Sequence, residues 1–229
     1  GGWNDAVAGH PGSLFQAHHQ AFAFYANYAD GTPGRAAHLR DETDFMRALS
    51  TNELPAVSFI KPYGQDNEHP GYASELQGQQ HVADLVNAVK ASPYWADTAI
   101  IITYDEFGGR WDHVAPPVID RWGPGTRVPA IIISPYAKKG FVDHTQYETV
   151  SILKTIEQRW DLAPLTSRDA AAASLINAFD FPAETPPPGM PTTGAGPAGL
   201  PLIGLLAGGG IVLACAGLVL RRRRRASTI

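Results

Sequence analysis

The sequence predicts an α/β fold, namely a three-layer α/β/α sandwich with a largely parallel sheet, of which this chain forms a partial domain. Short apolar runs bounded by turn residues indicate buried strands. Stretches with helical spacing and capping residues separate or follow them, in the order strand, helix, strand, strand, helix. The 229 residues, 44% of them hydrophobic, suffice for one core and some appended sequence.

The first two predicted elements are a strand and a helix. Residues 55–60, Pro-Ala-Val-Ser-Phe-Ile, form a short apolar run that is typical of a buried strand. Residues 74–77, Ser-Glu-Leu-Gln, have the form of a capping box. The apolar residues that follow are spaced as one helix face, and they are Val82, Leu85, Val86 and Val89.

Two further apolar runs predict neighbouring buried strands, Thr98 to Tyr104 and Ala130 to Ser134, because both are rich in β-branched residues. A second capping box, Thr-Gln-Tyr-Glu at 145–148, predicts a helix that continues to about Trp160. Together these elements assign residues 1–181 to the globular body.

The remaining residues indicate attachment to a membrane. Residues 182–199 are rich in Pro and Gly, as in an extended linker. Residues 200–220 are uncharged and mostly apolar, and as a helix they would span roughly 30 Å, the thickness of a bilayer core. Residues 221–229 begin with five arginines, which favour a cytoplasmic tail and place the body outside the cell.

Charge and cysteine content exclude several other functions. Arg221 to Arg225 supply five of the 18 basic residues, which leaves 13 basic against 22 acidic residues in 1–194, a formal charge of −9. A body this acidic argues against a nucleic-acid partner. The single cysteine, Cys215, lies in the apolar run and is neither a zinc ligand nor a nucleophile by this context.

The polar residues after the second predicted strand form the candidate site. Asp105 and Glu106 follow Tyr104 directly, and Asp112 and His113 come seven residues later. Ligands of α/β sheets bind at the carboxyl ends of strands, and adjacent carboxylates there suit a divalent metal ion. Oxygen ligands favour Ca²⁺, Mg²⁺ or Mn²⁺, while nearby imidazole also admits Zn²⁺ or Fe; the alternative is a solvated loop.

The motif Thr-Tyr-Asp-Glu-Phe-Gly-Gly at 103–109, with Trp-Asp-His-Val at 111–114, resembles the signature of the bacterial phosphoesterase family that contains phospholipases C and acid phosphatases. Segments at 15–20, 58–71 and 127–135 are similar to that family in the same order. The resemblance covers about residues 3–180 and implies an alkaline-phosphatase-like fold that hydrolyses phosphate esters, including phospholipids.

By the same resemblance, Asp105 and Glu106 bind the metal, and His69 faces the phosphate or the leaving group. His113 contacts phosphate, with Asp112 either doing the same or only orienting His113. His19 is the candidate phosphate neighbour further upstream, with His18 as an equal rival. The family's Glu-Asn metal segment and its Ser or Thr nucleophile are not recognisable here, so we expect a missing N-terminal part to supply the nucleophile.

Three functions remain open at this level: a phosphoester hydrolase, an inactive surface-displayed binding module, and another metal hydrolase of the same superfamily. The substrate head group and the metal stay open. Residues 190–194, Met-Pro-Thr-Thr-Gly, followed by the apolar span and the arginines, resemble a sortase signal. That resemblance implies a sortase partner, covalent linkage to peptidoglycan and a location on the outside of the cell envelope, with a plain membrane anchor as the alternative. The first residues carry neither an initiating Met nor a signal peptide, which predicts a longer parent chain.

Overall fold

The computed structural model of the chain describes residues 3–181, 210–214 and 218–219, and these fall into two compact units. The first unit contains the described residues up to Pro135 together with the two C-terminal strands, and the second begins at Tyr136. The helices and strands are α1 (Trp3–Val7), α2 (Pro33–His38), α3 (Glu42–Ala48), β1 (Val57–Phe59), α4 (Glu75–Ala91), β2 (Thr98–Thr103), β3 (Ala130–Ile133), α5 (Val150–Trp160), α6 (Ser167–Ala171), β4 (Gly210–Ala214) and β5 (Leu218–Val219).

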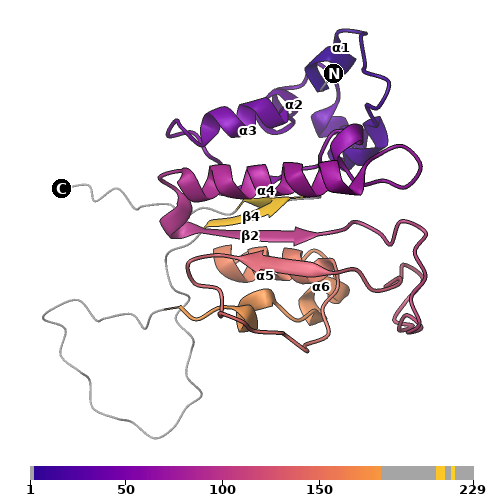
Figure 1. Cartoon of the computed structure of the whole chain (residues 1–229), viewed down its shortest axis with the longest axis vertical. Coiled ribbons are helices and arrows are strands. Elements are labelled where there is room, and N and C mark those ends of the chain that lie inside the picture. The colour runs from indigo at the N-terminus through magenta and orange to yellow at the C-terminus, as the bar shows by residue number, and fades with distance from the viewer. Residues whose placement is uncertain (1–2, 182–209, 215–217, 220–229) are drawn as a thin grey trace, which may run out of the picture. The chain divides into compact units, whose positions relative to one another are not determined.

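The first unit is built on a mixed sheet with the strand order β1-β4-β2-β3 (Figure 1). β1, β4 and β2 run parallel, whereas β3 and β5 pair with β2 in the antiparallel direction. The predicted neighbours, β2 and β3, do pair, with Ile102 opposite Ile131. The α/β class is confirmed, but the sheet is less parallel than predicted, and the three-layer arrangement stays a prediction.

β2 and β3 differ in how deeply their side chains are buried. β2 is buried along almost its whole length, and Ile100 is completely inaccessible. In β3, by contrast, Ile131 is 57% exposed, so the prediction that both strands are buried is wrong for β3. A run of isoleucines indicates a strand but cannot tell a central strand from one that pairs on only one side.

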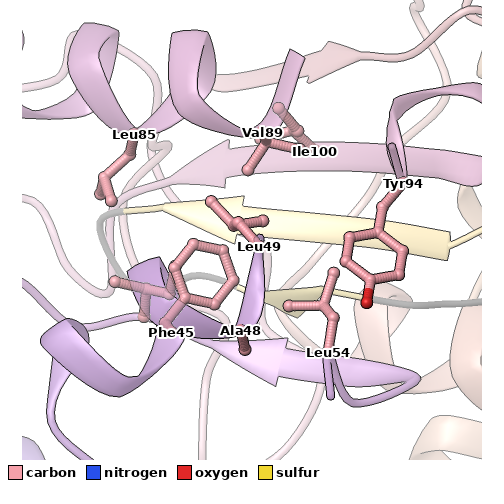
Figure 2. Packing of buried hydrophobic residues seen from close by; sticks show 9 residues of the cluster. Phe45, Ala48, Leu49, Leu54, Leu85, Val89, Tyr94 and Ile100 are labelled. Carbon is pink, nitrogen blue, oxygen red and sulfur yellow. The ribbon is translucent and has the colours of Figure 1, made fainter. Parts of the chain in front are cut away.

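The core of the first unit joins α3 and α4 to the sheet. Leu85 and Val89 of α4 pack with Phe45 of α3, with Leu49 and with Ile100 of β2, and Figure 2 shows these side chains pointing toward one another. α4 begins where the sequence predicts, because the Ser74 hydroxyl accepts the backbone N–H of Gln77. The predicted apolar face of α4 is therefore confirmed as its packing face.

The second unit contains α5 and α6. α5 ends at Trp160 as predicted but begins at Val150, five residues after the predicted cap at Thr145. Asp143 explains the difference, because its carboxylate accepts the backbone N–H of Thr145 and the hydroxyl of Tyr147. These bonds hold the segment in a turn, which competes with helix formation.

Two carboxyl groups are buried between α5 and α6. Asp169 accepts the backbone N–H groups of Leu165 and Thr166. Glu157 is 4% exposed, and its carboxyl group lies beside that of Asp169. Burial, followed by the neighbouring Asp169, raises the pKa of Glu157. Burial therefore disfavours the ionised form of Glu157 in the folded protein.

We expect Glu157→Gln to raise the melting temperature of the protein by several degrees at neutral and alkaline pH, and to change it little below pH 4.5. A carboxyl group whose pKa is raised by folding stabilises the fold below its unfolded pKa, and this contribution is lost as the pH rises through the folded pKa. Glutamine keeps the uncharged form throughout. Calorimetry across this pH range tests the prediction, with exposed Asp161→Asn as the control; a difference that does not vary with pH would contradict it.

The described parts of the predicted C-terminal helix have a different structure. Gly210–Ala214 is a strand between β1 and β2, with Ile211 opposite both Val57 and Ala99, and Leu218–Val219 is a second strand. A short apolar run suits a buried parallel strand as well as a helix, so periodicity alone does not separate the two. The linker, the pentapeptide at 190–194 and the arginine tail lie outside the described residues. Within the described part of the chain, no helix combines the length and the apolar character needed to cross a membrane.

Candidate active site

The candidate site lies at the carboxyl ends of β1 and β2. Lys61 comes two residues after β1, and Asp105 comes two residues after β2. Because β1 and β2 are both parallel to β4, their ends meet at the same edge of the sheet. There Lys61 Nζ lies 2.5 Å from Asp105 Oδ2. This contact joins two motifs that are 44 residues apart in the sequence.

Asp105 is ionised in this setting. Burial acts to raise the pKa of Asp105, but the hydrogen bond and the charge of Lys61 outweigh it, and the pKa is lowered. The Lys61 side chain is 20% exposed, while the Asp105 side chain is 53% exposed. A carboxylate that is both charged and open to solvent can still take a further cation.

His19 belongs to the same cluster. Burial lowers the pKa of His19, and the charges of Lys61, His18 and His69 act in the same direction, while Asp105 acts in the other. His18 is exposed, and its ring meets the His19 ring edge-on with centroids 4.5 Å apart. Of the two rival histidines, His19 is the one whose pKa responds to the charges of Lys61 and Asp105.

His69 lies on a loop that is braced against both α4 and β2. The preceding residue, Glu68, has a positive φ of 60°, and its carboxylate accepts the hydroxyl of Tyr104. Gly78 of α4 permits this arrangement, because a Cβ there would lie 2.3 Å from the side chain of Glu68. The His69 ring stacks on Tyr72, and its Nδ1 lies 2.7 Å from the carbonyl oxygen of Pro70.

The His69 loop and the loop after β2 are neighbours. A Cβ at Gly108 would lie 3.4 Å from the ring of Pro70. Glu106 turns back within its own loop, where its Oε2 accepts the backbone N–H of Gly108 at 2.7 Å. The structure thus places Asp105 in contact with Lys61 and near His19, with the His69 loop beside the loop that carries Glu106. Metal binding by Asp105 and Glu106 stays a prediction.

Asp112 fixes the far end of this loop. Its two oxygens accept the guanidinium of Arg127 at 2.9 and 2.8 Å, and the backbone N–H of Val114 at 3.0 Å. These bonds, led by that of Arg127, hold the pKa of Asp112 well below its usual range. His113 is mostly exposed, and its Nδ1 lies 3.8 Å from Asp112 Oδ1. In this geometry Asp112 is paired with Arg127, and the pair holds the loop in place. The catalytic roles of Asp112 and His113 stay predictions.

A cavity of about 640 Å³ adjoins the cluster, and His19 and Lys61 lie in its wall. Aromatic residues Trp3, Phe15 and Tyr63 line it further along. Sequence reasoning assigned no role to Lys61, Tyr104, Glu68 or Arg127. Lys61 could have been recognised from the sequence, since it follows the predicted strand at 55–60 and lies in the segment 58–71 that resembles the family. The Glu68–Tyr104 and Asp112–Arg127 contacts depend on chain segments 36 and 15 residues apart, which no local pattern reports.

The chain is similar in sequence to known proteins. A sequence profile of the phosphoesterase family matches residues 3–163. The chain is 30% identical to a non-hemolytic phospholipase C of Pseudomonas aeruginosa, in an alignment that covers 64% of this chain and 27% of that protein. It is 32% identical to non-specific phospholipase C6 of Arabidopsis thaliana, over 57% of this chain and 31% of that one. It is 31% identical to phospholipase C B of Mycobacterium tuberculosis, over 65% and 33% respectively. The chain therefore spans about a third or less of the length of these relatives.

Proposed function

The chain belongs to the phosphoesterase family, and we propose that it forms the phosphate-binding, metal-assisted part of a hydrolase of phosphate esters, of the phospholipase C or acid phosphatase type. The observation that supports this most strongly is the contact of Lys61 with Asp105 beside His19 and His69. A lysine ammonium group next to a charged, half-exposed carboxylate suits a phosphate ester together with a divalent cation.

Asp105 and Glu106 supply part of the ligand set that a hard metal ion needs. Asp105 and Glu106 are exposed oxygen donors, and each engages only one oxygen in the hydrogen bonds described above. Among the described residues, no cluster of three or more His, Cys, Asp or Glu side chains could hold a metal, so further ligands would have to come from elsewhere. A bound divalent ion would neutralise the negative charge that develops on the phosphoryl oxygens.

This chain's own residues would bind and orient the substrate. Lys61 would hold a phosphoryl oxygen by a charged hydrogen bond, His19 would donate a ring N–H to a second oxygen, and His69 would lie near the leaving oxygen. Two hydroxyls near the sheet are already engaged, because Thr103 Oγ1 donates to the carbonyl of Pro129 and Ser134 Oγ to that of Thr98. Neither is free to attack phosphorus. We propose that the nucleophile lies in a segment of the parent protein that precedes the region matched to the family here.

A hydrolysis assay tests the proposal, in a protein that carries this chain within a domain of the relatives' length. We expect release of the alcohol from a p-nitrophenyl phosphomonoester or phosphodiester, or of diacylglycerol from phosphatidylcholine, dependent on an added divalent metal. p-Nitrophenyl sulfate is the control for the sulfatase-like alternative. If only the sulfate ester is cleaved, the phosphoesterase assignment fails. If no ester is cleaved and inorganic phosphate does not bind, the protein is a binding module.

A further inference from the structure

A hydrogen bond joins the two residues that immediately precede Asp105 and His69. The hydroxyl of Tyr104 donates to the carboxylate of Glu68, 36 residues away in the sequence. Tyr104 stands directly before Asp105, and Glu68 stands directly before His69. Both residues of the bond are half-buried, whereas the two residues that follow them are exposed. The bond therefore ties the end of β2 to the His69 loop next to the candidate site groups.

The sheet anchors the Tyr104 end of this bond. Tyr104 follows directly on β2, which pairs with β3 on one side and β4 on the other. Thr103, the last residue of β2, is 8% exposed, and its hydroxyl donates to the carbonyl of Pro129. The backbone that carries Tyr104 is thus held by the sheet, and its hydroxyl is a firm point of attachment for the loop.

Glu68, at the other end, has an unusual backbone conformation. Its φ of 60° lies in a region that residues with a side chain rarely adopt. α4 leaves room for the Glu68 side chain at Gly78, where a Cβ would lie 2.3 Å from its Cγ. Backbone conformations of this kind persist only where surrounding contacts impose them, and they cluster at functional sites. The close approach to Gly78 and the bond from Tyr104 are two such contacts.

The ring of His69 is oriented within its own loop. It stacks on Tyr72 with ring centroids 4.4 Å apart, and the backbone N–H of His69 donates to Asn67 Oδ1 at 2.9 Å. The carbonyl oxygen of Pro70, 2.7 Å from Nδ1, can only accept, so Nδ1 carries a proton and Nε2 is the nitrogen that can meet a ligand. The position of the ring relative to Asp105 depends instead on how the loop is attached to β2.

We propose that Glu68 and Tyr104 are positioning residues, whose hydrogen bond sets the place of His69 relative to Asp105. This inference rests on the proposed function, in which His69 lies near the leaving oxygen of a phosphate ester. Neither side chain has to touch the substrate, because both act through the residues that follow them. A displacement of about 1 Å in such a group can lower the rate by on the order of 10²-fold.

Two phosphodiesters that differ only in their leaving group test the proposal, in a protein that carries this chain within a domain of the relatives' length. A p-nitrophenolate leaves with the electron pair of the P–O bond and needs no proton. An ethoxide leaving group takes that electron pair and also accepts a proton from Nε2 of His69. We expect Tyr104→Phe to lower kcat for the ethyl ester by about tenfold or more and for the nitrophenyl ester by less than about twofold.

The matched control is Tyr147→Phe, which removes the same kind of hydroxyl–carboxylate bond, to Asp143, from the second unit. It should leave the ratio of the two kcat values unchanged, and KM should stay nearly constant in both variants. An equal loss for the two esters in Tyr104→Phe would indicate only a smaller amount of active protein, and it would overturn the proposal.

Substitutions of Glu68 test whether the bond itself is responsible. Glu68→Gln keeps an oxygen that can accept the Tyr104 hydroxyl, so it should retain most of the activity on the ethyl ester. Glu68→Leu should lose as much of this activity as Tyr104→Phe, and the double variant should lose no more than either alone. Losses that add in the double variant would show that the two residues act independently, which contradicts the proposal.

A measurement without turnover separates this inference from the proposed function. In the full chain with ¹³C-labelled histidine, we expect Tyr104→Phe to shift and broaden the ring signal of His69 in the NMR spectrum, and Tyr147→Phe to leave it unchanged. A His69 signal that does not respond to Tyr104→Phe would overturn the inference whatever the activity. A clear response in a protein whose parent hydrolyses no phosphate ester would reject the proposed function and leave the hold of this bond on His69 intact.

Discussion

Asp105→Asn is expected to lower phosphoester hydrolysis by about 10³-fold in a protein that carries this chain within a complete family domain. Asparagine keeps the shape of the side chain but removes its charge, so it is a weaker ligand for a hard cation and a weaker partner for Lys61. The measurement is kcat/KM for a soluble phosphodiester as a function of metal concentration, together with the amount of metal bound.

Asp84→Asn provides the matched control, because it removes the same charge from an exposed position on α4. Both variants should unfold at nearly the same temperature as the parent, since Asp105 lies beyond the end of β2 and outside the core. Near-normal turnover of Asp105→Asn with metal still bound would remove Asp105 from the metal ligands and would leave it only its contact with Lys61.

Lys61→Met is expected to lower hydrolysis by about 10²-fold, because it removes a half-buried cationic donor from the place where negative charge would develop. Lys61→Arg should recover part of the loss, since arginine keeps the charge but changes the geometry of the donors. Phosphorus NMR of inorganic phosphate added to the chain separates two roles. If Lys61 contacts phosphate, Lys61→Met weakens phosphate binding directly.

If Lys61 only positions Asp105, phosphate binding in the absence of metal is unchanged and metal affinity falls instead. Lys90→Met, an exposed lysine in the last turn of α4, is the control for the loss of one positive charge. A Lys61→Met variant with normal phosphate binding, normal metal affinity and normal turnover would contradict both roles.

Several features followed from local sequence because their causes are local. The Ser74 cap and the four apolar residues after it predict α4 and its packing face, since both depend on neighbours within a few residues. The isoleucine runs predict β2 and β3 in the same way, and the predicted pairing of these two strands is observed. Asp105 and Glu106 could be assigned to a strand end because the strand before them is unmistakable.

Other features arise only from contacts between distant segments. One miss had a local cause: the capping-box pattern predicts a helix at Thr145, but the nearby Asp143 side chain holds that segment in a turn, and α5 starts at Val150. The sequence makes Asp112 a candidate catalytic residue. In the structure, however, its oxygens accept hydrogen bonds from Arg127, fifteen residues away. The burial of β3 also differs from the prediction, because exposure depends on what covers a strand and not on its own residues.

The sequence by itself determined the α/β class, the family, and the identity of the acids and histidines that carry the candidate chemistry. The tertiary structure decided which of them meet. The sheet brings the ends of β1 and β2 to one edge, and only there do Lys61 and Asp105, 44 residues apart, form an ion pair with His19 beside them. Charge interactions act over a few ångströms of space irrespective of distance along the chain, so a lysine that looks ordinary in sequence becomes part of the site.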